Sequence, residues 1–138
     1  NFFAHLSPVG PIRKNKIIEQ GIKFFFKKKK NNLQTMRSVS EMVQPAYKMM
    51  RIINGKLCSI KKKDFDLNKL NKPRQSYEKT YVPNGLIDII SKKNIEINKT
   101  THGKKTIPFL VNQMYVDIDD KNDLLYAKYL ISKKKGLL

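Results

Sequence analysis

The sequence predicts an α/β fold, in which helices cover a sheet, and three observations support this. An apolar helical period near the start is followed by several short apolar strands, and an amphipathic helix closes the chain. Strands that alternate with helices are typical of a layered α/β domain. The length of 138 residues fits one domain, and the apolar fraction of 40% is sufficient for a packed core.

The first helix is predicted over residues 15–29. Residues 7–13, which we call the Ser-Pro segment, precede it and contain two prolines and a glycine, so they are not helical. Asn15 is a suitable N-cap, and the lysines at 27–30 suit the last turn, where cations oppose the helix dipole. Apolar or small residues recur at helical spacing on one face, at Ile17, Ile18, Gly21, Ile22 and Phe25.

Three short strands are predicted next, over residues 33–40, 47–53 and 56–60. Asn54-Gly55 separates the last two and is the strongest hairpin signal in the sequence. Residues 61–79 are polar and rich in lysine, and they indicate a long loop. Long ordered loops in compact domains often carry function.

The second half continues the alternation. A turn at 82–85 leads into an apolar strand at 86–90, which is interrupted by Asp88. A polar stretch at 91–104 has the composition of a loop with a short helical turn. Residues 106–111 then form another short apolar strand.

The C-terminal part is the most regular. Tyr115–Asp119 alternates like a strand, and a helix begins at Asp120 with Asp123 in its first turn, where the helix dipole favours negative charge. One face of this helix is apolar, at Leu124, Ala127 and Ile131.

Asp117 and Asp119 are the candidate metal ligands. On a strand, residues two apart point to the same face, so the two carboxylates would lie close together and repel each other. A divalent cation relieves that repulsion, and oxygen ligands with several retained waters suit Mg²⁺. The alternative is a polar strand end followed by a helix cap.

The composition limits the function classes. The net charge is +18, which is typical of proteins that bind nucleic acid or another polyanion. The excess is almost entirely lysine, whereas specific nucleic-acid contacts depend on arginine, so we expect nucleic-acid binding not to be the main role.

Cysteine content and hydropathy indicate the compartment. Cys58 is the single cysteine, which excludes an internal disulfide and a cysteine-based zinc site. No apolar run approaches the roughly 20 residues that a membrane span requires. We therefore expect a cytoplasmic protein without a membrane partner.

Short motifs follow one another along the chain in a definite order. After the Ser-Pro segment come SV-x-E, Pro-x-x-Lys, RQ, NG-x-I, KTIP and DID, at residues 36–41, 45–48, 73–75, 83–89, 105–108 and 116–119. In kind and order these motifs resemble those of acylneuraminate cytidylyltransferases, the CMP-sialic acid synthetases. The resemblance extends over residues 1 to about 131.

The resemblance implies a fold, and it implies which part of the enzyme domain this chain represents. The fold would be part of a three-layer nucleotidyltransferase (Rossmann-like) sheet with a small dimerisation hairpin. Residues 1–138 would be the C-terminal part of a cytidylyltransferase domain, and residues 34–60 its dimerisation region, so a homodimer is expected. In the family, the loop that holds the CTP phosphates precedes the Ser-Pro segment. We therefore expect this chain to begin after that loop and to be inactive alone.

The resemblance also implies an activity. The family transfers CMP from CTP to a nine-carbon 2-keto sugar acid and releases pyrophosphate. Asp117 and Asp119 match its catalytic magnesium ligands. The substrate-binding positions that the resemblance carries over are Lys48, Arg74, Asn84 and Gly85.

Two alternatives stay open. One is the synthetase for the eight-carbon 3-deoxy-octulosonic acid, although NG-x-I and KTIP fit the sialate-type enzymes better. The other is a basic protein that binds nucleic acid or another polyanion, whose binding would fall steeply with salt and would not depend on Mg²⁺. The sequence leaves the identity of the sugar acid open.

Overall fold

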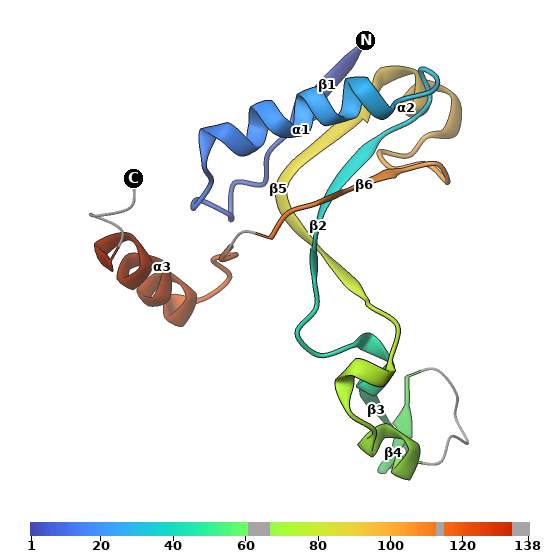
Figure 1. Ribbon diagram of the computed structural model, residues 1–138, viewed down its shortest axis with the longest axis vertical. Helices are drawn as coiled ribbons and strands as arrows, with labels where there is room; N and C mark the ends of the chain where they lie inside the picture. The colour runs from blue at the N-terminus through green and yellow to red at the C-terminus, as the bar shows by residue number, and fades with distance from the viewer. Residues whose placement is uncertain (61–66, 113–114, 134–138) are drawn as a thin grey trace. The chain divides into compact units, whose positions relative to one another are not determined.

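The computed structural model describes residues 1–60, 67–112 and 115–133, and its fold is mixed α/β, as predicted (Figure 1). The chain divides into two compact units. The larger unit contains residues 1–40 and 83–138, and the smaller unit contains residues 41–82. None of the helices in the described ranges combines the length and the apolar character needed to cross a bilayer.

The described part of the larger unit is built on a four-stranded mixed sheet with the order β1-β5-β2-β6. The strands are β1 (Phe2–His5), β2 (Met36–Glu41), β5 (Tyr81–Ser91) and β6 (Ile107–Leu110). β1 is antiparallel to β5, and β2 is parallel to β6. β5 and β2 are antiparallel. Asn84, near the start of β5, bonds to Ser40 near the end of β2, whereas Asp88, further along β5, bonds to Ser38, which comes earlier in β2.

β5 is the central strand of the core. The predicted strand at 86–90 is confirmed and is longer than expected, since it begins at Tyr81 and ends at Ser91. Residues 86–90 are all buried, including Asp88. A strand that is buried on both faces needs neighbours on each side of the sheet.

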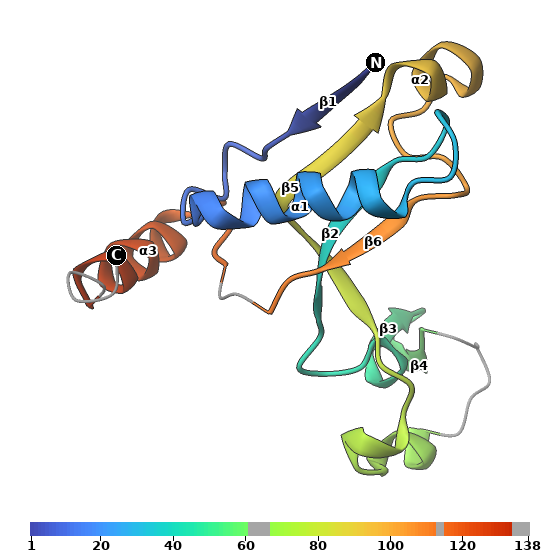
Figure 2. The same ribbon diagram turned by 45° about the horizontal axis from the view of Figure 1, so that its top comes forward.

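The first helix is confirmed as α1 (Asn15–Lys28), and it lies across one face of the sheet (Figure 2). Gly21 permits a close approach, because a Cβ there would stand 3.0 Å from the Ile87 Cγ2 atom and 3.3 Å from the Phe109 ring. The prediction of Asn15 as N-cap is wrong. Lys14 is the N-cap, since its carbonyl already accepts the Ile17 N–H at 2.9 Å, and its side chain makes no capping bond.

The strand β1 was not predicted. It is only four residues long, too short for an alternating pattern, and it becomes a strand through pairing with β5. Its Phe2 ring packs edge-on against Phe25 of α1, with 5.1 Å between the ring centroids.

The connection from β5 to β6 contains α2 (Lys92–Asn98), the helical turn expected in the polar stretch. Ser91 caps this helix, because its side-chain oxygen accepts the Asn94 N–H at 3.2 Å. Lys99 ends it in the left-handed region, at φ +54°. The predicted strand at 106–111 is confirmed as β6.

The predicted strand at Tyr115–Asp119 is wrong: these residues form no strand and belong to no sheet. Their neighbour is the Ser-Pro segment, where the Val9 carbonyl accepts the Ile118 N–H at 2.9 Å. Pro8 and Pro11 have no N–H to donate, so this segment cannot continue a ladder.

The closing helix is confirmed as α3 (Lys121–Lys133). Asp120 accepts the N–H groups of Asn122 and Asp123 at 2.7 and 3.0 Å, and Asp123 accepts the Asp120 N–H at 3.1 Å. This is a reciprocal capping box. On the predicted apolar face Ala127 is buried, while Leu124 and Ile131 are exposed.

The smaller unit contains the predicted hairpin, formed by β3 (Met50–Ile53) and β4 (Lys56–Ser59). Asn54 and Gly55 both have positive φ, at +50° and +73°, as a type I′ turn requires. Part of the predicted loop, residues 61–66, lies outside the described residues. The remainder contains the 3₁₀ helices η2 (Leu67–Asn71) and η3 (Arg74–Ser76), and η1 (Ala46–Lys48) precedes the hairpin.

Candidate functional site

The candidate site lies at one edge of the sheet, which we call the carboxyl edge. The parallel strands β2 and β6 both end there, and the Ser40 hydroxyl donates to the Val111 carbonyl at 3.1 Å. The Asn84 amide of β5 reaches the same edge and donates to the Ser40 hydroxyl at 2.9 Å. Open α/β sheets bind their ligands outside the carboxyl ends of their strands.

Asn84 and Gly85 form a closely packed pair of residues at this edge. Asn84 is fully buried, and its side-chain oxygen accepts the Leu86 N–H at 3.2 Å. Gly85 has φ +61°, and a Cβ there would stand only 2.8 Å from the Ser7 Cβ. Backbone angle and space therefore both require glycine at this position.

The Ser-Pro segment packs against Gly85. The Ser7 N–H donates to the Gly85 carbonyl at 3.1 Å. The Arg13 guanidinium donates from Nη2 to the carbonyls of Ser7 and Gly85, at 3.0 and 3.2 Å. Arg13 thus joins two motifs that lie 72 residues apart in the sequence.

Asp117, which belongs to the DID motif, lies close to the Ser-Pro segment. A Cβ on Gly10, which is buried, would stand 3.4 Å from Asp117 Oδ1 and 3.9 Å from Arg13 Nη2. Oδ1 is buried and has no hydrogen-bond partner among the described residues; the same is true of Arg13 Nε. The site therefore contains a half-buried carboxylate whose inner oxygen is unsatisfied.

The electrostatics of Asp117 follow from its surroundings. Burial raises the pKa of the Asp117 carboxyl, and the charges of Asp119 and Asp123 raise it further. Asp123 is engaged in the capping box, where it accepts the N–H groups of Asp119 and Asp120 at 3.1 Å. Asp119 is exposed to solvent.

Asp117 and Asp119 supply carboxylate oxygens, the ligand type that Mg²⁺ takes, but no strand at 115–119 brings both of them to one face. Within the described ranges, no group of three or more His, Cys, Asp or Glu side chains could hold a metal. Mg²⁺ does not need such a group, because it is usually bound through one or two carboxylates, substrate phosphates and several waters. The unsatisfied Oδ1 of Asp117 is a hard oxygen of the kind that Mg²⁺ prefers.

Lys48 and Arg74 lie in the smaller unit. Lys48 donates from Nζ to the Lys72 carbonyl at 3.0 Å, and its Nζ lies 5.9 Å from the centre of the Tyr77 ring. Arg74 is exposed at the start of η3, and its carbonyl accepts the Tyr77 N–H at 3.2 Å. The two predicted basic residues thus share Tyr77 as a neighbour, while Asn84, Gly85 and Asp117 belong to the larger unit, where Arg13 bonds to Gly85 and Gly10 lies close to Asp117.

Sequence reasoning missed two residues of this site, Gly10 and Arg13. Both belong to the Ser-Pro segment, and their membership of that motif was the only available signal. Their roles depend on contacts with Gly85 and Asp117, which no local pattern reveals.

Compared with known proteins, the sequence matches no protein-family model and no curated protein. The motifs therefore remain a resemblance.

Proposed function

We propose that this chain is the C-terminal part of a nucleotidyltransferase of the CMP-sialic acid synthetase type, which transfers CMP from CTP to a 2-keto sugar acid and releases pyrophosphate. The observation that supports it best is the meeting of three motifs at the carboxyl edge. The Ser-Pro segment, the Asn84-Gly85 turn and Asp117 are distant in sequence, yet Arg13 and Gly10 connect them.

The chemistry asks for positioning and for neutralisation of charge. The anomeric oxygen of the sugar acid attacks the α-phosphorus of CTP, and an O–P bond forms while the bond to the β-phosphate oxygen breaks. The hydroxyl proton passes to solvent, and pyrophosphate leaves. A divalent cation bound by Asp117 and Asp119 would offset the phosphate charge and assist ionisation of the hydroxyl.

Two residues of the carboxyl edge act as positioning residues in this proposal. Asn84 uses both ends of its amide internally, on Ser40 and Leu86, so it is a positioning residue that holds the turn. Arg13 fixes the Ser-Pro segment against Gly85 in the same way. The resemblance alone assigns Lys48 and Arg74, which lie in the smaller unit, to the sugar carboxylate, which needs cationic partners.

The sheet offers an edge for the rest of such an enzyme. β1 is the outer strand of the described sheet, and Phe3 on it is exposed. An unpaired edge strand is a template for another strand. In the proposed enzyme, strands from a preceding segment that carries the CTP-phosphate loop would pair along β1.

The test of activity uses the protein from the complete reading frame that contains this chain. Pyrophosphate release from CTP is measured with Mg²⁺ and each of several nine-carbon 2-keto acids, with the eight-carbon acid as the competing substrate. We expect release only with a nine-carbon acid, and its loss in Asp117→Asn and Asp119→Asn. Glu19→Gln, a change at an exposed carboxylate of α1, is the control that should retain activity. No release with any sugar acid would refute the proposal.

Metal binding can be tested on the 138-residue chain itself. Mn²⁺ is a paramagnetic substitute for Mg²⁺, and it should broaden the amide NMR signals of residues close to Asp117, including Gly10. The double variant D117N/D119N should lose this broadening, whereas E19Q should keep it. Broadening that persists in the double variant would remove Asp117 and Asp119 from the metal site.

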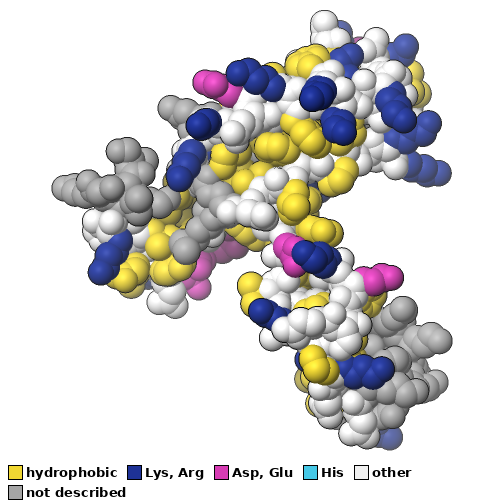
Figure 3. Space-filling view, viewed as in Figure 1, with side chains coloured by type: hydrophobic (Ala, Val, Ile, Leu, Met, Phe, Trp, Pro, Cys, Tyr) yellow, Lys and Arg dark blue, Asp and Glu magenta, His cyan; other side chains and the backbone are white. Residues whose placement is uncertain are grey.

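The polyanion alternative has weaker support. Figure 3 shows the Lys and Arg side chains of the larger unit in separate groups among apolar and neutral side chains on the face that it draws. Nucleic-acid sites usually gather their basic residues in one patch or stripe. Binding to heparin or DNA that is as strong as CTP binding, steeply salt-dependent and independent of Mg²⁺ would favour this alternative.

A further inference from the structure

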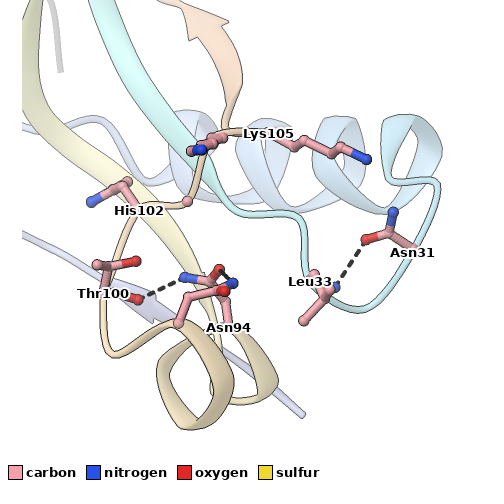
Figure 4. Close-up of a pocket in the computed structure, with 9 residues that line it drawn as sticks. Asn31, Leu33, Asn94, Thr100, His102 and Lys105 are labelled. Atoms are coloured by element: carbon pink, nitrogen blue, oxygen red, sulfur yellow. Dashed lines mark hydrogen bonds between the residues drawn. The ribbon is translucent and has the colours of Figure 1, made fainter.

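A pocket of about 500 Å³ lies at the edge of the sheet opposite to the carboxyl edge (Figure 4). It is lined by residues that precede the first residues of β2 and β6, together with the inner side of α2. We call it the lysine pocket, after Lys104 and Lys105, which lie in its wall. Its volume is in the range of sites for small molecules.

The charge of the lysine pocket has one sign. The charged side chains of its lining are Lys104 and Lys105, and the lining contains no carboxylate. Lys104 and Lys105 form no ion pair with any residue that the structure describes. Two ammonium groups without a counter-charge, beside a concave surface, create a positive potential that attracts anions.

The wall of the pocket is preformed by Asn94, which is buried. Its Nδ2 donates to the Thr100 carbonyl at 2.6 Å, and its Oδ1 accepts the Asn98 amide at 2.9 Å (Figure 4). Gly103 passes so close that a Cβ there would stand 2.7 Å from Asn94 Oδ1. Gly103 thus allows the loop before β6, which carries the two lysines, to pack closely against Asn94.

His102 lies beside Asp88 and Thr101. Its Nε2 lies 3.2 Å from the Oδ2 of the buried Asp88, and its Nδ1 lies 3.2 Å from the Thr101 hydroxyl. Asp88 is also 3.7 Å from Arg37 Nε, so its negative charge has partners other than the lysines. The charge of Lys104 and Lys105 is thus left for a ligand.

We propose that the lysine pocket binds a small phosphate dianion. Compact ammonium groups are good point-charge partners for phosphate oxygens. The neutral side chains of Asn31, Asn98 and Thr100 in the lining add hydrogen-bonding groups for a polar body attached to the phosphate. This inference goes beyond the proposed function and does not depend on it, because the pocket lies at the other edge of the sheet.

The test titrates the 138-residue chain with glucose 6-phosphate, inorganic phosphate and glucose, without metal, and follows amide and His102 ring signals by NMR. We expect saturable shifts at residues 100–105 with the two phosphates and none with glucose. Tighter binding of glucose 6-phosphate would identify a phosphate ester as the ligand. Equal binding would identify the free anion, and both results support the pocket. No saturation with either phosphate would overturn the proposal.

Variants then locate the binding. K104A/K105A, and the milder K104Q/K105Q, should weaken phosphate binding about tenfold or more, since each removes two charge-assisted contacts. K23A/K93A removes the same charge from exposed lysines outside the pocket, and it should weaken binding at most about twofold because only general attraction is lost. D117N should bind as the unaltered chain does. Equal losses in the two lysine pairs, or a loss in D117N, would overturn the proposal.

Discussion

Ser38 and Asp88 hold β2 and β5 together through their side chains. The Asp88 carboxylate accepts the Ser38 N–H at 3.1 Å, and the Ser38 hydroxyl accepts the N–H of the neighbouring Ile87 at 3.0 Å. Both residues are buried. An acid in an otherwise apolar strand is thereby explained as a structural link at the centre of the sheet.

This link predicts the effect of removing the carboxylate. Asp88→Ala should lower the free energy of unfolding by about 2–3 kcal/mol, since the buried Ser38 N–H loses its charged acceptor and Arg37 and His102 lose a nearby negative charge. Asp88→Asn keeps an acceptor for the Ser38 N–H and should cost less. Urea denaturation measures both. An Asp88→Ala variant as stable as the unaltered chain would contradict the structural role.

Gly85 is predicted to tolerate no side chain. Gly85→Ala combines a positive φ with a Cβ at 2.8 Å from the Ser7 Cβ, so it should destabilise by about 1–3 kcal/mol and displace the Ser-Pro segment. Gly55→Ala is the matched control, because its φ is also positive but nothing lies within 4 Å. It should cost only the backbone strain, about 1 kcal/mol. Equal losses of unfolding free energy would argue against the contact with Ser7.

The raised pKa of Asp117 predicts a pH-dependent stability. Because the folded chain holds the Asp117 proton more tightly than the unfolded chain, protonated Asp117 favours folding. This contribution is complete below the ordinary value of 3.8 and is lost as the pH rises through the raised pKa. Asp117→Asn removes the cost of the buried charge, so it should be more stable than the unaltered chain at neutral pH. The difference should vanish near pH 3.

Thermal melting of both proteins between pH 3 and 8 measures this difference. Glu19→Gln is the control, since it alters an exposed carboxylate on α1. An Asp117→Asn variant that is less stable than the unaltered chain at pH 7 would show that the carboxylate has a stabilising partner in solution.

The hairpin of the smaller unit is predicted to mediate a homodimer. Ile52 and Leu57 are opposite each other in the β3–β4 register, and they are 73% and 55% exposed. Met50, two residues before Ile52 in β3, is on the same face of the hairpin and is 50% exposed. Apolar side chains gathered in this way often mark an interface.

Sedimentation of the intact protein should show a dimer, and I52S/L57S should shift it toward the monomer. K56S, a change at an exposed neighbour in β4, is the control that should remain dimeric. A monomer at all accessible concentrations of the unaltered protein would contradict the prediction.

The sequence by itself determined the local elements of this protein. The apolar period of α1, the Asn54-Gly55 turn and the acidic first turn of α3 act through neighbours only a few residues away, so their patterns are sufficient to predict them. The apolar run of β5 also predicted a strand, because a strand that is buried on both faces does not need to alternate apolar and polar residues.

Only the tertiary structure decided the remaining features. β1 becomes a strand by pairing with β5. Tyr115–Asp119 lies beside the Ser-Pro segment, whose prolines have no N–H to donate to a neighbouring strand, and it therefore stays outside the sheet. The same holds for the site, because Arg13 and Gly85 are bonded across 72 residues and Asp117 lies close to Gly10, more than 100 residues earlier in the chain. Such contacts depend on how distant segments fold back on one another, and the energies that select them appear only when the chain is packed.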